Sequence, residues 1–422
     1  MSYIQPSWFG FIMMWRILYF FLFYHIVCNL QGQNLGFSLA SEKKKVQIPI
    51  EIYNNLVIIP VVLNEALPLK FILDTGVRTA ILTQKTFTDI LNLVYARKYT
   101  ISGPGGQNTI DAYITNNVSL GLPGVHGRGH ALLVLGQDYL ELRNYLGTDV
   151  HGILGYELFS RFIVQIDYEK KILTLMLPEK FRKPRRFQTI PMSIEDTKPY
   201  VYSRVVFENG LTLNAKLLMD SGASHGLMLE PTSSEVIQVP EHAVSSLIGR
   251  GLGGEIVGKV GRIESISLGS YELDNAIANF PDPNSYSDSI KIGNTFRNGA
   301  IGGEILSRFT VIYNFSAEEV YLKKNSSFKN RFYYNLSGIT LKAKGAQLNT
   351  FEVTEVRDKS PSQTGGIQPG DIVLSLNGIE VKQLDLNTMN GYLNSKPGRK
   401  IRLEISRKGE KIRKEFELRD QI

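Results

Sequence analysis

Two aspartates of this chain stand in the same three-residue motif, each directly behind an apolar run. The first motif is Asp74-Thr75-Gly76, preceded by Phe71-Ile72-Leu73, and the second is Asp220-Ser221-Gly222, preceded by Leu217-Leu218-Met219. Burial makes a carboxylate at such a place costly unless it is compensated. The middle hydroxyl can bond nearby backbone or a carboxylate, and the glycine permits a tight turn and close approach of another backbone.

The chemistry expected of this pair depends on the two motifs meeting. If two similar halves pack about a pseudo-twofold axis, Asp74 and Asp220 become neighbours. Carboxyls about 3 Å apart share one proton, because both cannot ionise together. The charged member can act as base toward a water, and the protonated member can donate to a peptide carbonyl. We therefore predict hydrolysis of amide bonds with no metal and no cofactor.

A second repeated element supports this pairing over the alternative that each aspartate is an ordinary turn residue. Ile153-Leu154-Gly155 is matched by Ala300-Ile301-Gly302, and the shift between them equals that between the aspartates to within one residue. Two matches at nearly one shift indicate a duplicated unit. We predict one copy over residues 46–178 and the other over 188–324, with a solvated basic linker between them.

The elements that must position the motifs are strands. Short β-branched runs between glycine-rich turns, such as Val57 to Leu63, predict a mainly β protein. Each copy also contains a glycine-rich stretch suited to a hairpin tip. The tip glycines are Gly105 and Gly106 in the first copy, and Gly253 and Gly254 in the second.

These motifs resemble the retropepsin-like branch of aspartic proteases, in the bacterial form with two fused lobes. The resemblance implies that Asp74 and Asp220 are catalytic. It also implies support of the catalytic loops by Thr75, Gly76, Ser221, Gly222, Gly155 and Gly302, with the glycine-rich hairpins as flaps over the substrate. The first motif departs from the family in continuing as Val77-Arg78, and an inward-pointing Arg78 would lower carboxylate pKa values.

The C-terminal part, residues 330–422, resembles a PDZ domain of the bacterial type. The similarity lies in the run from Ser360 to Asp371 and in the turn signal Asn377-Gly378. PDZ domains bind a peptide as an added strand and hold its carboxylate with backbone N–H groups. The resemblance places that loop at Ser337-Gly338-Ile339 and implies a small β-sandwich with helices.

Histidines offer weaker candidates. His126 and His130 are four residues apart, but two glycines lie nearby and the glutamate of a zinc-protease helix is missing, so no metal site is predicted. His225, close behind the second motif, is either an ordinary loop residue or a group that tunes the site.

The N-terminal segment predicts export. Arg16 precedes an apolar run from Ile17 to Val27, which is typical of a secretory signal over residues 1–32. An uncleaved anchor and lipid attachment at Cys28 are the alternatives. Cys28 is the single cysteine, so no internal disulfide can form.

Together these features predict a secreted or periplasmic, monomeric aspartic endopeptidase acting on polypeptides, with a module that binds a peptide C-terminus. Contact with a membrane is expected only through an uncleaved N-terminal segment. The net charge of +7 is spread along the chain, which disfavours nucleic-acid binding. The alternative function is a peptide-binding adaptor that keeps the fold without the chemistry.

Overall fold

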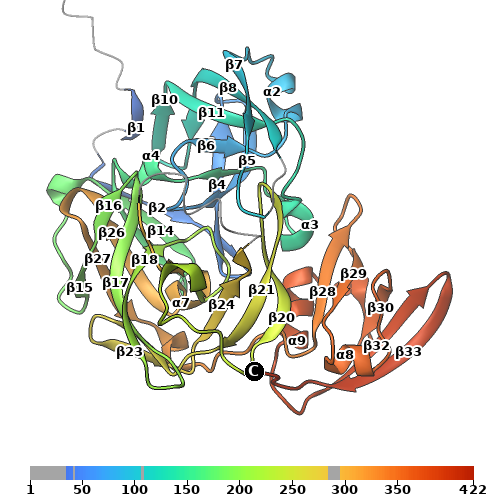
Figure 1. Ribbon diagram of the computed structural model, residues 1–422. Helices are drawn as coiled ribbons and strands as arrows, with labels where there is room; N and C mark the ends of the chain where they lie inside the picture. The colour runs from blue at the N-terminus through green and yellow to red at the C-terminus, as the bar shows by residue number, and fades with distance from the viewer. Residues whose placement is uncertain (1–34, 41–42, 106–108, 284–294) are drawn as a thin grey trace, which may run out of the picture. The chain divides into compact units, whose positions relative to one another are not determined.

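A computed structural model describes residues 35–40, 43–105, 109–283 and 295–422 (Figure 1). The predicted signal segment 1–32 and the flap residue Gly106 lie outside the described residues. Strands dominate the structure, and the predicted mainly β class is confirmed. Within the described ranges, no helix is both long enough and apolar enough to cross a membrane.

The first lobe is built around the strand that leads into Asp74. Its elements are β1 Gly36–Leu39, β2 Lys45–Pro49, β3 Glu51–Tyr53, β4 Leu56–Leu63, β5 Leu67–Leu73, β6 Ala80–Leu82, α2 Thr86–Ile90, β7 Arg97–Ile101, β8 Ile110–Val118, β9 Leu120–Gly121, β10 Val125–Arg128, β11 His130–Leu135, α3 Leu142–Leu146, β12 Gly152–Leu154, α4 Tyr156–Phe159, β13 Ile163–Asp167 and β14 Ile172–Met176. Its main sheet runs β3-β4-β5-β12-β6-β11-β8-β7.

The second lobe repeats this plan around the strand that leads into Asp220. Its elements are β15 Gln188–Pro191, β16 Ser193–Glu195, β17 Lys198–Val206, β18 Thr212–Met219, β19 Leu227–Leu229, β20 Val244–Gly251, β21 Gly254–Arg262, β22 Ser265–Leu268, β23 Tyr271–Asp274, β24 Ile277–Pro281, β25 Gly299–Ile301, α7 Gly303–Leu306, β26 Phe309–Asn314 and β27 Glu319–Lys324. Its main sheet runs β20-β21-β24-β19-β25-β18-β17-β22-β23.

The two lobes share their central pairings, as the repeat predicts. Strand β12 runs parallel to β5, and β25 runs parallel to β18 in the same way. On the other side, β12 is antiparallel to β6 and β25 is antiparallel to β19. The duplication seen in the sequence is therefore a duplication of topology.

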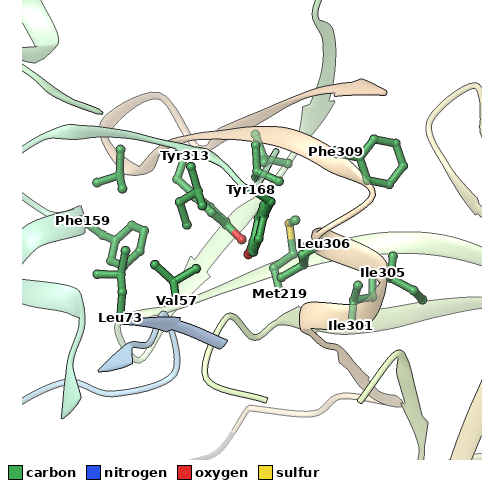
Figure 2. Close-up of a cluster of buried hydrophobic side chains, with 14 of the residues drawn as sticks. Val57, Leu73, Phe159, Tyr168, Met219, Ile301, Ile305, Leu306, Phe309 and Tyr313 are labelled. Carbon is green, nitrogen blue, oxygen red and sulfur yellow. The ribbon is translucent and has the colours of Figure 1, made fainter. Parts of the chain in front are cut away.

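A third sheet joins the lobes, in the order β15-β27-β26-β13-β14-β2. At its centre β13 of the first lobe pairs antiparallel with β26 of the second, with Val164 opposite Tyr313. Apolar side chains from both lobes pack into one core (Figure 2), including Ile301 and the two residues that directly precede the aspartates, Leu73 and Met219, all with 0% exposure. The two motifs are thus fixed on a common base.

The C-terminal unit has a separate core and a sheet in the order β28-β29-β30-β32-β33. Its elements are β28 Ile339–Lys344, β29 Thr350–Val356, α8 Pro361–Thr364, β30 Ile372–Leu376, β31 Ile379–Glu380, α9 Leu386–Leu393, β32 Lys400–Arg407 and β33 Glu410–Glu417; the short 3-10 turns of the chain are η1 Pro178–Lys180, η2 Pro231–Ser233, η3 Phe315–Ala317, η4 Ser326–Lys329 and η5 Val381–Gln383. The predicted turn at Asn377-Gly378 has positive φ at both residues, 50° and 84°, as a tight hairpin turn requires. The domain boundaries stay predictions. Strand β1 precedes residue 46, where the first copy is predicted to begin, and it pairs antiparallel with β10.

Candidate active site

Each candidate aspartate lies in the loop that follows a buried strand, and the neighbouring strand braces that loop. The Asp74 N–H donates to the Leu154 carbonyl at 2.9 Å, and the Asp220 N–H donates to the Ile301 carbonyl at 2.8 Å. The residue that follows each of these two carbonyls must be small. A Cβ at Gly155 would lie 2.0 Å from the carbonyl oxygen of Asp74.

The middle residues of the two motifs cross-link the lobes in a reciprocal way. The Thr75 hydroxyl donates to the Met219 carbonyl at 2.5 Å and accepts from the Ser221 N–H at 3.0 Å. The Ser221 hydroxyl donates to the Leu73 carbonyl at 2.8 Å and accepts from the Thr75 N–H at 3.1 Å. Both side chains are fully buried. We call these four bonds the hydroxyl grip; it locks each loop to the strand of the opposite lobe.

The grip brings the two carboxyls into contact. Asp74 and Asp220 are within hydrogen-bonding reach of each other. Each carboxyl also accepts from the N–H of its own motif glycine, at 2.6 Å for Gly76 and 3.0 Å for Gly222. A Cβ at Gly222 would lie 2.2 Å from the Asp74 carboxyl carbon, so glycine is required there by the closeness of the opposite aspartate.

Burial raises the pKa of both carboxyls, and repulsion by the partner adds to the rise at Asp74. For Asp74, burial is the largest cause of the raised pKa, and the charge of Asp220 adds to it. Burial also raises the pKa of Asp220, but the nearby Arg297 opposes that rise most strongly. Lys198 lowers the pKa of both. The pair therefore favours a proton on Asp74 and a charge on Asp220.

The predicted flap tips meet each other. The second predicted flap corresponds to the hairpin β20–β21, whose Gly253 N–H donates to the Pro104 carbonyl of the first tip at 2.9 Å. A Cβ at Gly105 would lie 2.0 Å from the carbonyl oxygen of Gly254. Leu252 of the second tip packs against the apolar cluster of the first lobe that contains Ile81. The structure thus brings Gly105, Gly253 and Gly254 together as a closed pair of tips.

Comparison with protein families agrees with this geometry. Residues 59–158 match the family of aspartyl proteases, and residues 335–418 match the PDZ domain family.

The chain contains an aspartyl protease domain and a C-terminal PDZ domain.

The protease match includes Asp74 and Gly155 but ends ahead of Asp220. The assignment of the second lobe to the same fold rests on the repeat and on the shared strand pairings. No curated protein matches the chain.

The other predicted candidates in the protease domain are Arg78 and three histidines. Arg78 points outward with 72% of its side chain exposed and faces Asp196 at 3.9 Å. Burial lowers the pKa of His225 to about 4, which keeps it uncharged above that pH. His126 is exposed, whereas His130 is buried and contacts Glu157. Among the described residues, no group of three or more His, Cys, Asp or Glu is placed to hold a metal ion.

Sequence reasoning missed two cations near the carboxyls, Lys198 and Arg297. The repeat holds a signal for both. Tyr200 pairs with Leu218 as Ile58 pairs with Ile72, which aligns Lys198 with the apolar Leu56 of the first lobe. Arg297 lies two residues before β25, where the first lobe has Val150 ahead of β12. At both positions the first lobe has an apolar residue and the second lobe has a cation, and both cations lower the pKa of Asp220.

The predicted carboxylate loop of the PDZ domain is occupied by its own neighbours. Ser337, Gly338 and Ile339 are buried. The Gly338 N–H donates to Asn335, at 2.9 Å to the side-chain oxygen, and the Ile339 N–H donates to the Ser337 hydroxyl at 3.2 Å. Two of the N–H groups expected to hold a peptide carboxylate are thus already used, and the binding role of this loop stays a prediction.

Proposed function

We propose that this chain is an aspartic endopeptidase that hydrolyses peptide bonds with a water held between Asp74 and Asp220. The observation that carries the proposal is the contact of two half-buried carboxyls, held from opposite lobes by the hydroxyl grip. A pair of this kind needs no reorganisation to act as acid and base together. The protease match over the first lobe supports the same function.

In the proposed mechanism, Asp220 is the base and Asp74 the acid. Arg297 favours the charged form of Asp220, which takes a proton from the water as the water attacks the peptide carbonyl. Asp74, whose pKa is raised by burial and by Asp220, donates its proton to the carbonyl oxygen. Asp220 then gives the proton it took from the water to the leaving nitrogen as the C–N bond breaks, and Asp74 takes back a proton from a hydroxyl of the tetrahedral intermediate, so that the pair returns to its starting state. The meeting flap tips must part to admit a polypeptide and close over it.

Three variants test this function: Asp74→Asn, Asp220→Asn and the double replacement. The substrate is an unfolded protein, sampled across pH 3–8 with and without an aspartic-protease inhibitor. We expect each single variant to lose cleavage and the double variant to be no worse, because the two carboxyls act as a unit. Thermal melting checks that each variant is folded.

A folded Asp220→Asn chain that keeps most of its cleavage would refute the mechanism. A wild-type chain that binds the unfolded protein at every pH without cutting it would instead favour the adaptor function.

Export and a monomeric state belong to the same proposal. Residues 1–32 are proposed as a cleaved signal, leading to the periplasm or the exterior, and N-terminal sequencing from the native host should begin near Gln33. One chain supplies both aspartates, so specific activity should not fall on dilution. Activity that tracks a dimer dissociation constant would contradict the single-chain site.

A further inference from the structure

The PDZ domain contacts the protease domain at the place where a peptide would be expected to add. Strand β28 lies at one end of the PDZ sheet order. Peptides bind PDZ domains by joining a sheet edge as an extra strand. Here the segment around α3 of the first lobe, residues 141–147, lies against that edge, which we call the β28 edge.

The contacts at the β28 edge are specific and polar. The Asn144 amide donates to the Ala343 carbonyl at 2.7 Å, and the Arg143 guanidinium donates to the Ala346 carbonyl at 2.6 Å. Lys342 of β28 donates to both carboxylate oxygens of Glu141, each at 2.7 Å. The Lys342 side chain is only 16% exposed, so this ion pair is partly shielded from water.

The same segment also packs against the helix beside the edge. A Cβ at Gly147 would lie 2.5 Å from the Cβ of Leu386, the first residue of α9. Residues 141–147 thus contact both β28 and the start of α9. They use backbone carbonyls of β28 and its adjoining turn, as a bound peptide would.

Tyr145 connects this segment to the second flap. The Arg250 guanidinium of β20 stacks 4.4 Å from the centre of the Tyr145 ring, and the Lys342 ammonium lies 5.4 Å from that centre. Both distances are within the range of cation–π attraction. One aromatic ring is therefore shared between the PDZ domain and the flap.

Two further contacts hold the base of the same flap. The Tyr334 hydroxyl donates to the Ser246 hydroxyl at 2.8 Å, and Arg262 donates to Asp420 at 2.7 Å. On its inner side, α3 packs Leu146 in one cluster with Ile72, two residues before Asp74. The segment 141–147 thus lies between the PDZ domain, the second flap and a catalytic strand.

We propose that residues 141–147 are the resident ligand of the β28 edge, and that this contact restrains the second flap. Any peptide that adds to β28 must first displace Asn144 from a carbonyl of the strand and Arg143 from a carbonyl of the adjoining turn, so occupancy of the PDZ edge and freedom of the flap are linked.

The test is hydrogen–deuterium exchange of the full chain carrying a charge swap. Lys342→Glu and Glu141→Lys each place like charges together, and the double variant restores an opposite pair. We expect each single variant to speed amide exchange about three- to tenfold in residues 142–147 and in the flap, residues 244–262, because local opening becomes easier. The double variant should return close to wild type.

Lys400→Glu is the matched control, because its ion pair with Glu415 lies in the same PDZ domain, is exposed, and spans 3.9 Å. It should leave both segments unchanged. Faster exchange confined to residues 142–147 would refute the restraint on the flap. Unchanged exchange in both segments, or a double variant that exchanges like the singles, would refute the resident-ligand assignment.

Discussion

Replacement of Thr75 by valine isolates the hydroxyl grip from the rest of the site. Valine keeps the branched shape of threonine but removes the hydroxyl, which donates to the Met219 carbonyl at 2.5 Å and accepts from the Ser221 N–H at 3.0 Å. Both Thr75 and Ser221 have 0% exposure, so water cannot take over these bonds. The variant leaves the Met219 carbonyl and the Ser221 N–H buried without these hydrogen bonds.

The expected cost follows from those two groups. A buried polar group left without a partner costs about 1–3 kcal/mol, so Thr75→Val should lower the free energy of unfolding by about 2–6 kcal/mol. That is a large part of the roughly 5–15 kcal/mol typical of a folded domain. Urea unfolding followed by circular dichroism measures the loss. Cleavage should fall as well, because the loop carrying Asp74 loses its hold on the opposite lobe.

Thr83→Val is the matched control in the same lobe. Thr83 is 1% exposed, and its hydroxyl donates to the His151 carbonyl at 2.9 Å. The Thr83 N–H donates to the same carbonyl, also at 2.9 Å, so the control strands no backbone group. Its cost should be about 1 kcal/mol. A Thr75→Val chain no less stable than the Thr83→Val chain would refute the account of the grip.

Two further predictions concern the carboxyl pair. Gly222→Ala should abolish cleavage, because its Cβ would collide with the Asp74 carboxyl. The control Gly391→Ala lies in α9, has no atom within 4 Å of the added carbon, and should cost no stability. An active Gly222→Ala enzyme would contradict the packing described at this glycine. The pKa values of Asp74 and Asp220 in the folded chain are raised above the ordinary 3.8, so the folded chain binds more protons than the unfolded chain, and stability falls as pH rises from 3.8 through the raised values. Denaturation at several pH values should show a smaller fall in Asp220→Asn, and an equal fall would mean that these carboxyls are not the source.

The parts of the site that were predictable from sequence are those encoded by repetition. The aspartates, their strands and the bracing glycines occur twice, so a local pattern was enough to expect their roles and their pairing. Thr75 and Ser221 show the limit of this reasoning. Their hydroxyls were expected to reach nearby backbone or a carboxylate, and in the structure they reach backbone carbonyls of the opposite lobe. A residue type does not specify which distant strand will approach it.

Features that occur once were harder to predict. Tyr145 reads as an ordinary residue of a short helix, and its contact with Arg250 and Lys342 arises from three segments far apart in the chain. The loop Ser337-Gly338-Ile339 has the position expected of a carboxylate loop, but Asn335 and Ser337 supply internal acceptors for its N–H groups. Such local competition for hydrogen bonds depends on backbone geometry that composition alone does not determine.

The sheet that joins the lobes has a consequence for how the chain is made. Val164 faces Tyr313 while Ile166 faces Val311, and the repeat aligns Tyr313 with Ile166 and Val311 with Val164, so the pairing of β13 with β26 is self-complementary. During translation the first half emerges with β13 paired to β14 and its other edge bare, which is a template for joining another chain. A product that stalls before β26 therefore carries an edge that fits a second copy of itself. Translation that ends before β26 would release half-molecules that pair as homodimers, each copy contributing one Asp74.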